Sequence, residues 1–112
     1  MTIRLAIRAA TAGVFAVAVA TSIACARHTP QAHVVTVKDF TFQPPALTVS
    51  PGDTIVWTNS DFVPHTATAS DSTWDSKTIA AGGTWRFVAS TPGNISYYCV
   101  FHPNMKGTIE VR

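Results

Sequence analysis

The sequence predicts a single all-β domain, folded as an antiparallel β-sandwich or small barrel. Apolar residues alternate with a period of two, turn residues recur at short intervals, and no stretch between turns is long enough for a useful helix. About seven short strands at this spacing are typical of sandwiches and small barrels. Residues 25–112 suffice for one hydrophobic core but not for two domains.

Pairs of apolar residues mark the predicted strands in order along the chain. Each pair would face the core, because alternate side chains of a strand point to the same side. The pairs are Val35 and Val37, Leu47 and Val49, Ile55 and Trp57, Trp85 and Phe87, Ile95 and Tyr97, and Ile109 and Val111. Turn residues separate them at 44–45, 50–53, 59–61, 81–83, 91–94 and 102–107. For 67–78 we expect a surface excursion anchored by Trp74.

Residues 1–25 are expected to form an export signal, which would place the domain in the periplasm or elsewhere outside the cytoplasm. Arg4 and Arg8 precede an uncharged, small and apolar run from Ala9 to Ala24. A membrane-spanning helix needs about 20 strongly apolar residues, so this run fits a secretory signal better. A retained membrane anchor is the alternative.

Two processing sites are readable at the end of this signal. Ala24-Cys25-Ala26 has the form of an ordinary cleavage site. Ser22-Ile23-Ala24-Cys25 resembles a bacterial lipobox, in which Cys25 would become the lipidated first residue, although Ser22 replaces the usual leucine. We favour the lipoprotein interpretation, because a free exposed thiol is poorly suited to an oxidising compartment.

Residues 26–32 lack periodicity and are interpreted as a tether, and 33–112 as the folded domain. The whole chain carries a net charge of +2, but from Cys25 onward its basic and acidic residues balance. The bases there are Arg27, Lys38, Lys77, Arg86, Lys106 and Arg112, and the acids are Asp39, Asp53, Asp61, Asp71, Asp75 and Glu110. Without a basic cluster to neutralise phosphates, nucleic acid is excluded as an expected partner.

The segment that follows the predicted strand 95–99 carries three metal-ligating side chains. Cys99, His102 and Met105 are spaced three residues apart, and Pro103 should stop the strand from continuing. Strand alternation puts Cys99 on the buried face, and a loop of this length can fold the other two back toward its sulfur. A fourth ligand, His65, follows Pro64 in a loop after the strand 54–58, at what can be the same end of a sandwich.

Two imidazoles, one thiolate and a weak axial thioether are the ligands of blue-copper electron-transfer sites. We therefore expect His65, Cys99, His102 and Met105 to hold one copper ion. Each residue alone has an ordinary structural explanation: a buried cysteine, a hydrogen-bonded histidine or a core methionine. The combination favours the metal site.

These features resemble the plastocyanin and amicyanin branch of the cupredoxins over about residues 33–112. The resemblance is carried by the Cys99 loop, by 50–59 and by Val63-Pro64-His65-Thr66. The two residues between His102 and Met105 are similar to the short amicyanin loop, whereas plastocyanins have four. Thr66 stands where the family commonly has an asparagine that ties the two ligand loops together.

The resemblance implies a Greek-key sandwich and a type 1 blue copper that cycles between Cu(II) and Cu(I) as a single-electron carrier. Redox proteins would act as donor and acceptor, docking transiently where the edge of His102 reaches the surface. The surrounding apolar patch would contain Phe62, Val63, Pro64, Phe101 and Pro103. We further expect a monomer and no enzymatic activity.

Three other classes of protein are alternatives: an enzyme, a copper-binding module and a metal-free sandwich. A multicopper enzyme needs further histidine clusters, yet only His28 and His33 remain, and a Cys–His hydrolase needs a third orienting group and no methionine. A copper storage or delivery module, the main alternative, would favour a Met-rich or His-rich surface. A metal-free, immunoglobulin-like sandwich explains the strands but leaves the Cys99 loop unexplained.

Overall fold

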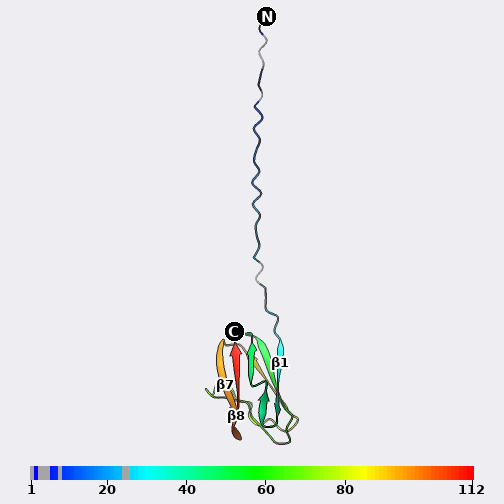
Figure 1. The fold of residues 1–112 in the computed structure, drawn as a ribbon, viewed down its shortest axis with the longest axis vertical. Helices are drawn as coiled ribbons and strands as arrows, with labels where there is room; N and C mark the ends of the chain where they lie inside the picture. Colours follow the sequence, from blue (N-terminus) through cyan, green and yellow to red (C-terminus); the bar gives the residue numbers. More distant parts are fainter. Residues whose placement is uncertain (1, 3–5, 8, 24–25) are drawn as a thin grey trace.

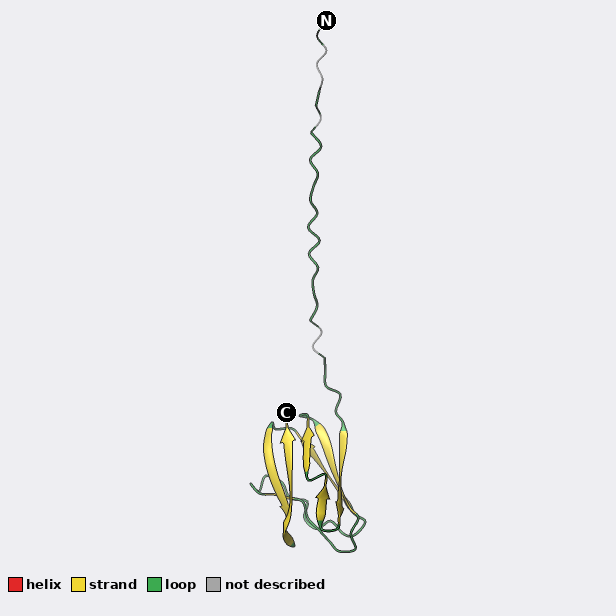
Figure 2. Ribbon diagram, viewed as in Figure 1, coloured by secondary structure: helices red, strands yellow, loops and turns green. Residues whose placement is uncertain are grey.

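The computed structural model describes residues 2, 6–7, 9–23 and 26–112, and within them the fold is all-β (Figures 1 and 2). Strands β1 to β8 begin at Ala32 and form two sheets of four strands each. The described residues up to 23 form no strand or helix and extend away from the domain (Figure 1). None of the described residues belongs to a helix that could cross a membrane.

The first sheet has the strand order β2-β1-β4-β6 and the second has the order β3-β8-β7-β5. The strands of the first sheet are β1 (Ala32–Lys38), β2 (Thr41–Gln43), β4 (Asp53–Asn59) and β6 (Thr84–Ala89). Those of the second are β3 (Ala46–Val49), β5 (Thr68–Ala69), β7 (Gly93–Cys99) and β8 (His102–Val111). The predicted single-domain sandwich class is therefore confirmed.

Both sheets are mixed rather than purely antiparallel. β1 runs parallel to β4, with Val35 opposite Trp57, and β3 runs parallel to β8. Because the chain crosses to the other sheet at β3 and returns at β4, strands distant in sequence become neighbours with the same direction. A period-two pattern reports which face is buried but not the direction of the neighbouring strand, so the sequence could not reveal these pairs.

Most of the predicted inward residues form the core between the sheets, and the others are partly buried and pack against it: Leu47, Trp85, Phe87 and Ile95. Val35, Val37, Ile55, Trp57, Tyr97, Ile109 and Val111 are all buried. The ring centroids of Trp57 and Tyr97 lie 5.5 Å apart in an edge-on arrangement. Burial raises the pKa of Tyr97 to about 12, so its phenol stays neutral at physiological pH.

Trp74 anchors its segment as predicted. The centroid of its ring lies 5.4 Å from that of Trp57 and 5.1 Å from that of Phe87. The same segment differs from the expected surface excursion at its start, where residues 67–69 are buried and include β5. The polar composition of this stretch suggested exposure, but Thr68 can be buried because its hydroxyl donates a hydrogen bond to Asp75.

The segment that precedes β1 is held against the domain by hydrogen bonds to one buried carboxylate, that of Asp53. His28 and His33 donate from Nε2 to its two oxygens at 2.6 and 2.8 Å, and the backbone N–H groups of Gln31 and Ser50 donate at 2.8 and 3.0 Å. The expected tether, residues 26–32, is thus held against β4 from His28 onward. These contacts, led by the Gln31 N–H, hold the pKa of Asp53 far below its usual range.

Because the folded carboxylate has a depressed pKa, its contribution to stability is present above the unfolded value of about 4 and is lost as the pH falls below it. We expect Asp53→Asn to lower the free energy of unfolding at pH 7 and to flatten its loss below about pH 4. Urea unfolding across pH 2–7 measures both effects. Glu110→Gln, at a half-exposed acid on β8, is the control, and equal pH slopes in the two variants would contradict the role of Asp53.

Candidate metal centre

The turn between β7 and β8 carries two of the expected ligands. Cys99 ends β7, His102 begins β8, and the two residues are paired across a turn formed by Val100 and Phe101. Pro103 does not stop a strand, contrary to expectation, because β8 continues through it. Proline is tolerated there, since it lies at the second position of the strand and beside an irregular stretch of the ladder.

That irregularity is a bulge that determines where Met105 lies. The pairing passes from Tyr98 opposite Lys106 directly to Cys99 opposite His102, so 103–105 have no partner on β7. Met105 is nevertheless 4% exposed and belongs to the same buried cluster as Cys99. The short spacing between His102 and Met105 is therefore accommodated within β8.

His65 comes from the loop after β4 and is fully buried. Its backbone pairs with Ile79 through two hydrogen bonds of 3.1 and 2.7 Å, which form an isolated bridge. The buried Asn59 side chain shapes the preceding loop, because its amide donates to the carbonyls of Val63 and Ile79 and its oxygen accepts from the Asp61 N–H. These contacts fix the loop before any metal binds.

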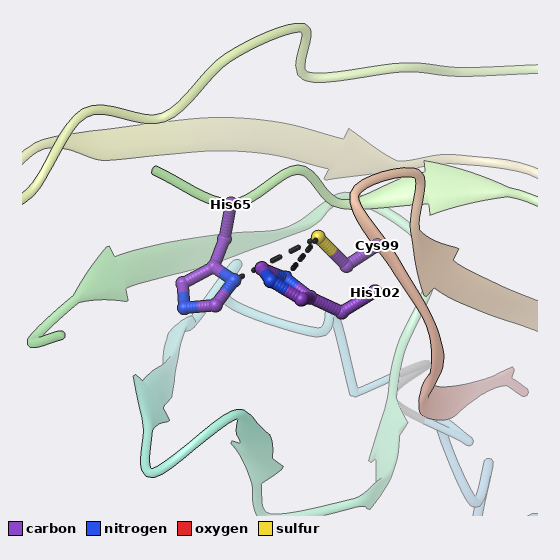
Figure 3. Close-up of side chains that lie close together, drawn as sticks. All are labelled: His65, Cys99 and His102. Carbon is purple, nitrogen blue, oxygen red and sulfur yellow. Dashed lines mark hydrogen bonds between the residues drawn. The ribbon is translucent and has the colours of Figure 1, made fainter. Parts of the chain in front are cut away.

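The two imidazoles face the Cys99 sulfur (Figure 3). Nδ1 of His65 and Nδ1 of His102 each lie 3.7 Å from Sγ. The donor atoms of the three residues all lie within 4.8 Å of one another, and the structure gathers no other such group among its described residues. Cys99 and His65 are fully buried, whereas His102 is partly exposed.

A backbone donor also points at the sulfur. The N–H of Thr66 lies 3.3 Å from Cys99 Sγ, the geometry of a hydrogen bond to sulfur. Such a bond stabilises a thiolate, the form in which cysteine binds metals. One turn, one loop and one backbone amide therefore converge on this sulfur.

Asp61 orients the buried imidazole from the side opposite the sulfur. Its carboxylate accepts a 2.8 Å hydrogen bond from His65 Nε2, so the other ring nitrogen, Nδ1, is the one that faces Cys99. The backbone N–H groups of Asp39 and Phe40 donate to the same carboxylate at 2.7 and 3.0 Å. Although partial burial acts to raise it, these hydrogen bonds hold the pKa of Asp61 below its usual range.

Phe40 packs against both imidazoles. Its ring meets those of His65 and His102 edge-on, with centroid distances of 5.3 and 4.8 Å. Asp39 and Phe40 both have positive φ values, an uncommon conformation for residues other than glycine. The two hydrogen bonds to Asp61 stabilise this turn and so place Phe40 over the site.

The sequence interpretation did not identify Asp61, Phe40 or Asn59 as part of the site. An acidic residue four positions before a loop histidine is a usable signal for Asp61, because a ligating imidazole commonly donates its second nitrogen to a carboxylate. Phe40 gave no comparable signal, since its position depends on how the β1–β2 turn lies against the 60–65 loop.

The chemistry of the donor set fits copper. A cysteine sulfur and two imidazoles would combine a soft donor for Cu(I) with donors acceptable to both oxidation states, and the thioether of Met105 belongs to the same buried cluster as Cys99. Zinc sites that serve structure are more often built from four equally strong Cys and His ligands.

Comparison with known proteins gives concordant results. The model of the cupredoxin-like domain family matches residues 8–111. The chain is 26% identical over 82 residues to amicyanin-alpha of Methylorubrum extorquens, an alignment that covers 69% of each chain.

Solved structures agree with this match. The Cu(I) form of one amicyanin mutant is 25% identical with a TM-score of 0.68, covering 78% of this chain and 88% of that one. The reduced state of another is 28% identical with a TM-score of 0.65, covering 72% and 82%. The chain therefore belongs to the cupredoxin-like family, and the relatives it is similar to here are amicyanins.

Proposed function

We propose that this protein is a single-electron carrier in which His65, Cys99, His102 and Met105 hold one copper ion. The observation that carries the proposal is the convergence of three donors within 4.8 Å in a site that is buried except at one imidazole. Copper bound there would supply a one-electron couple between Cu(II) and Cu(I). The amicyanin relatives whose solved forms are described as Cu(I) or reduced support this function.

The chain's own residues would keep the ligands still while the charge changes. His65 is fixed by Asp61 and by its pairing with Ile79, and Cys99 is fixed by β7 and the Thr66 N–H. A site whose groups are already in position reorganises little during a reaction. A small reorganisation cost is what a fast electron carrier requires.

His102 provides the proposed route for electrons, because it is the ligand whose ring is partly exposed. Large apolar residues surround it at this end of the sandwich. Phe62 is fully exposed, and Phe40, Val63, Val100 and Phe101 are at least one-third exposed, with Pro64 and Pro103 exposed beside them. We define these seven residues as the apolar patch. Exposed apolar surfaces commonly mark interaction sites, and we propose transient docking of redox proteins here.

Burial of the site favours an electron carrier over a copper storage or delivery module. Delivery requires an incoming ligand to reach the metal, yet Cys99 and His65 are fully enclosed and only His102 meets solvent. Electron tunnelling needs close approach of the partner but no ligand exchange. The same protected arrangement gives an enzyme's substrate no open coordination position.

We also propose that residues 1–25 direct export and that Cys25 becomes lipidated, which leaves a monomeric domain outside the cytoplasm. Both processing sites include Ala24 and Cys25, which lie outside the described residues. The attachment of His28 and Gln31 to Asp53 supports a short, well-defined connection between an anchor and the domain. Mass spectrometry of the mature protein, from membranes and from soluble extract, distinguishes a diacylated Cys25 from a cleaved Arg27 terminus.

A copper titration tests the electron-carrier proposal. We expect Cu(II) to bind at one equivalent, to give an intense visible band with a type 1 electron paramagnetic resonance signal, and to be reduced reversibly in a one-electron step. Zinc-loaded protein is the colourless control. A saturated but colourless Cu(II) protein, or copper that is released on reduction, would reject the carrier and favour storage or delivery.

Electron self-exchange tests the patch without knowledge of a partner, because two copies must approach through the exposed ligand. We expect Phe62→Glu to slow self-exchange roughly tenfold, since like charges then meet at the contact, and to leave the copper spectrum unchanged. Val88→Glu is the matched control, because Val88 is also exposed but lies opposite Thr54 at the other end of the sandwich. Equal slowing by both substitutions would place the contact elsewhere.

A further inference from the structure

Thr66 makes two links to the Cys99 turn. Its N–H points at Cys99 Sγ at 3.3 Å, and its hydroxyl oxygen accepts the Val100 N–H at 2.9 Å. The side chain is buried and lies next to His65 in sequence. One residue therefore joins the loop of the first ligand to the turn between two others.

The hydroxyl of Thr66 continues into a chain of hydrogen bonds that leads to the surface. Thr66 Oγ1 lies 3.0 Å from Thr68 Oγ1, which donates to Asp75 Oδ1 at 3.1 Å. Asp75 also accepts from the Lys77 N–H at 2.8 Å. This Lys77 contact, with the Thr68 hydroxyl, keeps the pKa of Asp75 below its usual range, so the carboxylate is an acceptor only.

That carboxylate determines the direction of every bond in the chain. Thr68 has one hydroxyl proton, and it is used toward Asp75, so the Thr68 oxygen accepts from Thr66. Thr66 therefore donates its only hydroxyl proton to Thr68, and its oxygen accepts a hydrogen bond from the Val100 N–H. Every hydrogen bond is therefore donated in the direction from the Val100 amide toward Asp75. No other arrangement satisfies all four groups.

We infer that Thr66, Thr68 and Asp75 act as a directed chain that positions the Cys99 turn and adjusts the metal centre from the surface. Thr66 and Thr68 are positioning residues, and Asp75 is the remote charge that orients them. The tuning half of this inference rests on the proposed copper function, whereas the positioning half concerns the polypeptide alone.

Amide hydrogen exchange of Val100 in the metal-free protein tests the positioning. Loss of one hydrogen bond is worth about 1 kcal/mol, so Thr66→Val should speed this exchange roughly fivefold, and Thr66→Ser should restore it. Thr68→Val and Asp75→Asn should give smaller accelerations in the same amide. Thr73→Val is the control, because Thr73 bonds only to Asp71 on the surface.

The redox equilibrium of the copper-loaded protein tests the tuning. Removing the negative charge that this chain links to the Cys99 turn favours the less positive Cu(I) state, so Asp75→Asn should favour reduction roughly twofold or more relative to Glu110→Gln. Glu110 lies opposite Asn94, at the end of the sheet away from His102.

Two results would overturn the inference. One is Val100 exchange unaffected by Thr66→Val. The other is faster Val100 exchange in Thr66→Val while Thr68→Val and Asp75→Asn give the same exchange rate as the control, Thr73→Val. Asp75 is exposed, so its variant folds even if the buried ones do not. Because exchange is measured without copper, these results stay separate from a failure of the electron-carrier proposal.

Discussion

In the Cys99→Ser variant, the copper-loaded protein is expected to lose its intense visible band, with absorbance falling roughly tenfold or more at equal copper occupancy. The colour of a blue-copper site comes from charge transfer between the thiolate sulfur and Cu(II), and a serine hydroxyl offers no equivalent donor. The two imidazoles remain in place, so a weaker, ordinary Cu(II) signal should replace the type 1 signal. Visible absorption and electron paramagnetic resonance on the same sample measure both changes.

The sequence provides a matched control in its second cysteine. The chain contains two cysteines, and Cys25→Ser removes the other thiol, which is not one of the expected ligands. This variant should retain the full band. If the band survived in Cys99→Ser and disappeared in Cys25→Ser, the thiolate would come from Cys25 and the assignment of Cys99 would be wrong.

The largest expected change in stability comes from Gly107→Ala. Tyr97 lies opposite Gly107 across β7 and β8, and a Cβ at 107 would come within 2.4 Å of a ring carbon and 2.5 Å of the phenol oxygen. Tyr97 is 1% exposed, and its ring packs against those of Phe42 and Trp57, which restrict its movement. Overpacking of this kind costs about 1–3 kcal/mol and occasionally more, and we expect the upper end of that range.

A double-mutant cycle identifies the cause. Leucine at 97 does not reach the space above 107, so Gly107→Ala should cost much less in a Tyr97→Leu background than in the natural protein. Equilibrium unfolding in urea gives the four free energies. If the alanine costs the same in both backgrounds, the strain arises from the backbone at 107 and not from the tyrosine ring.

Most of the fold could be predicted from local pattern. The alternation of Val35 with Val37, or of Ile55 with Trp57, follows from the geometry of a strand with one buried face, and these residues are buried as expected. The direction of β1 relative to β4 could not be predicted in this way. It depends on where the chain crosses between sheets, which no local residue preference encodes.

The metal centre shows the same division. Cys99, His102 and His65 were identified because their combination matches the ligands of a known kind of metal site, and the structure brings their donor atoms together. Phe40 and Thr68 escaped notice because their chemistry is unspecific. A phenylalanine gains its role from a turn held by Asp61, and a threonine gains its role from the direction imposed by Asp75.

Both ends of the folded domain lie away from the metal centre. The chain enters β1 at the same end of the sandwich as the C-terminus, whereas the turn between β7 and β8 lies at the opposite end (Figure 1). Arg112 remains tied to Val49 by a backbone hydrogen bond of 3.0 Å, so the C-terminal end is also fixed in place. A linker fused at either end could therefore attach the protein to an electrode with the His102 face outward, which gives voltammetry a defined orientation without altering any residue of the apolar patch.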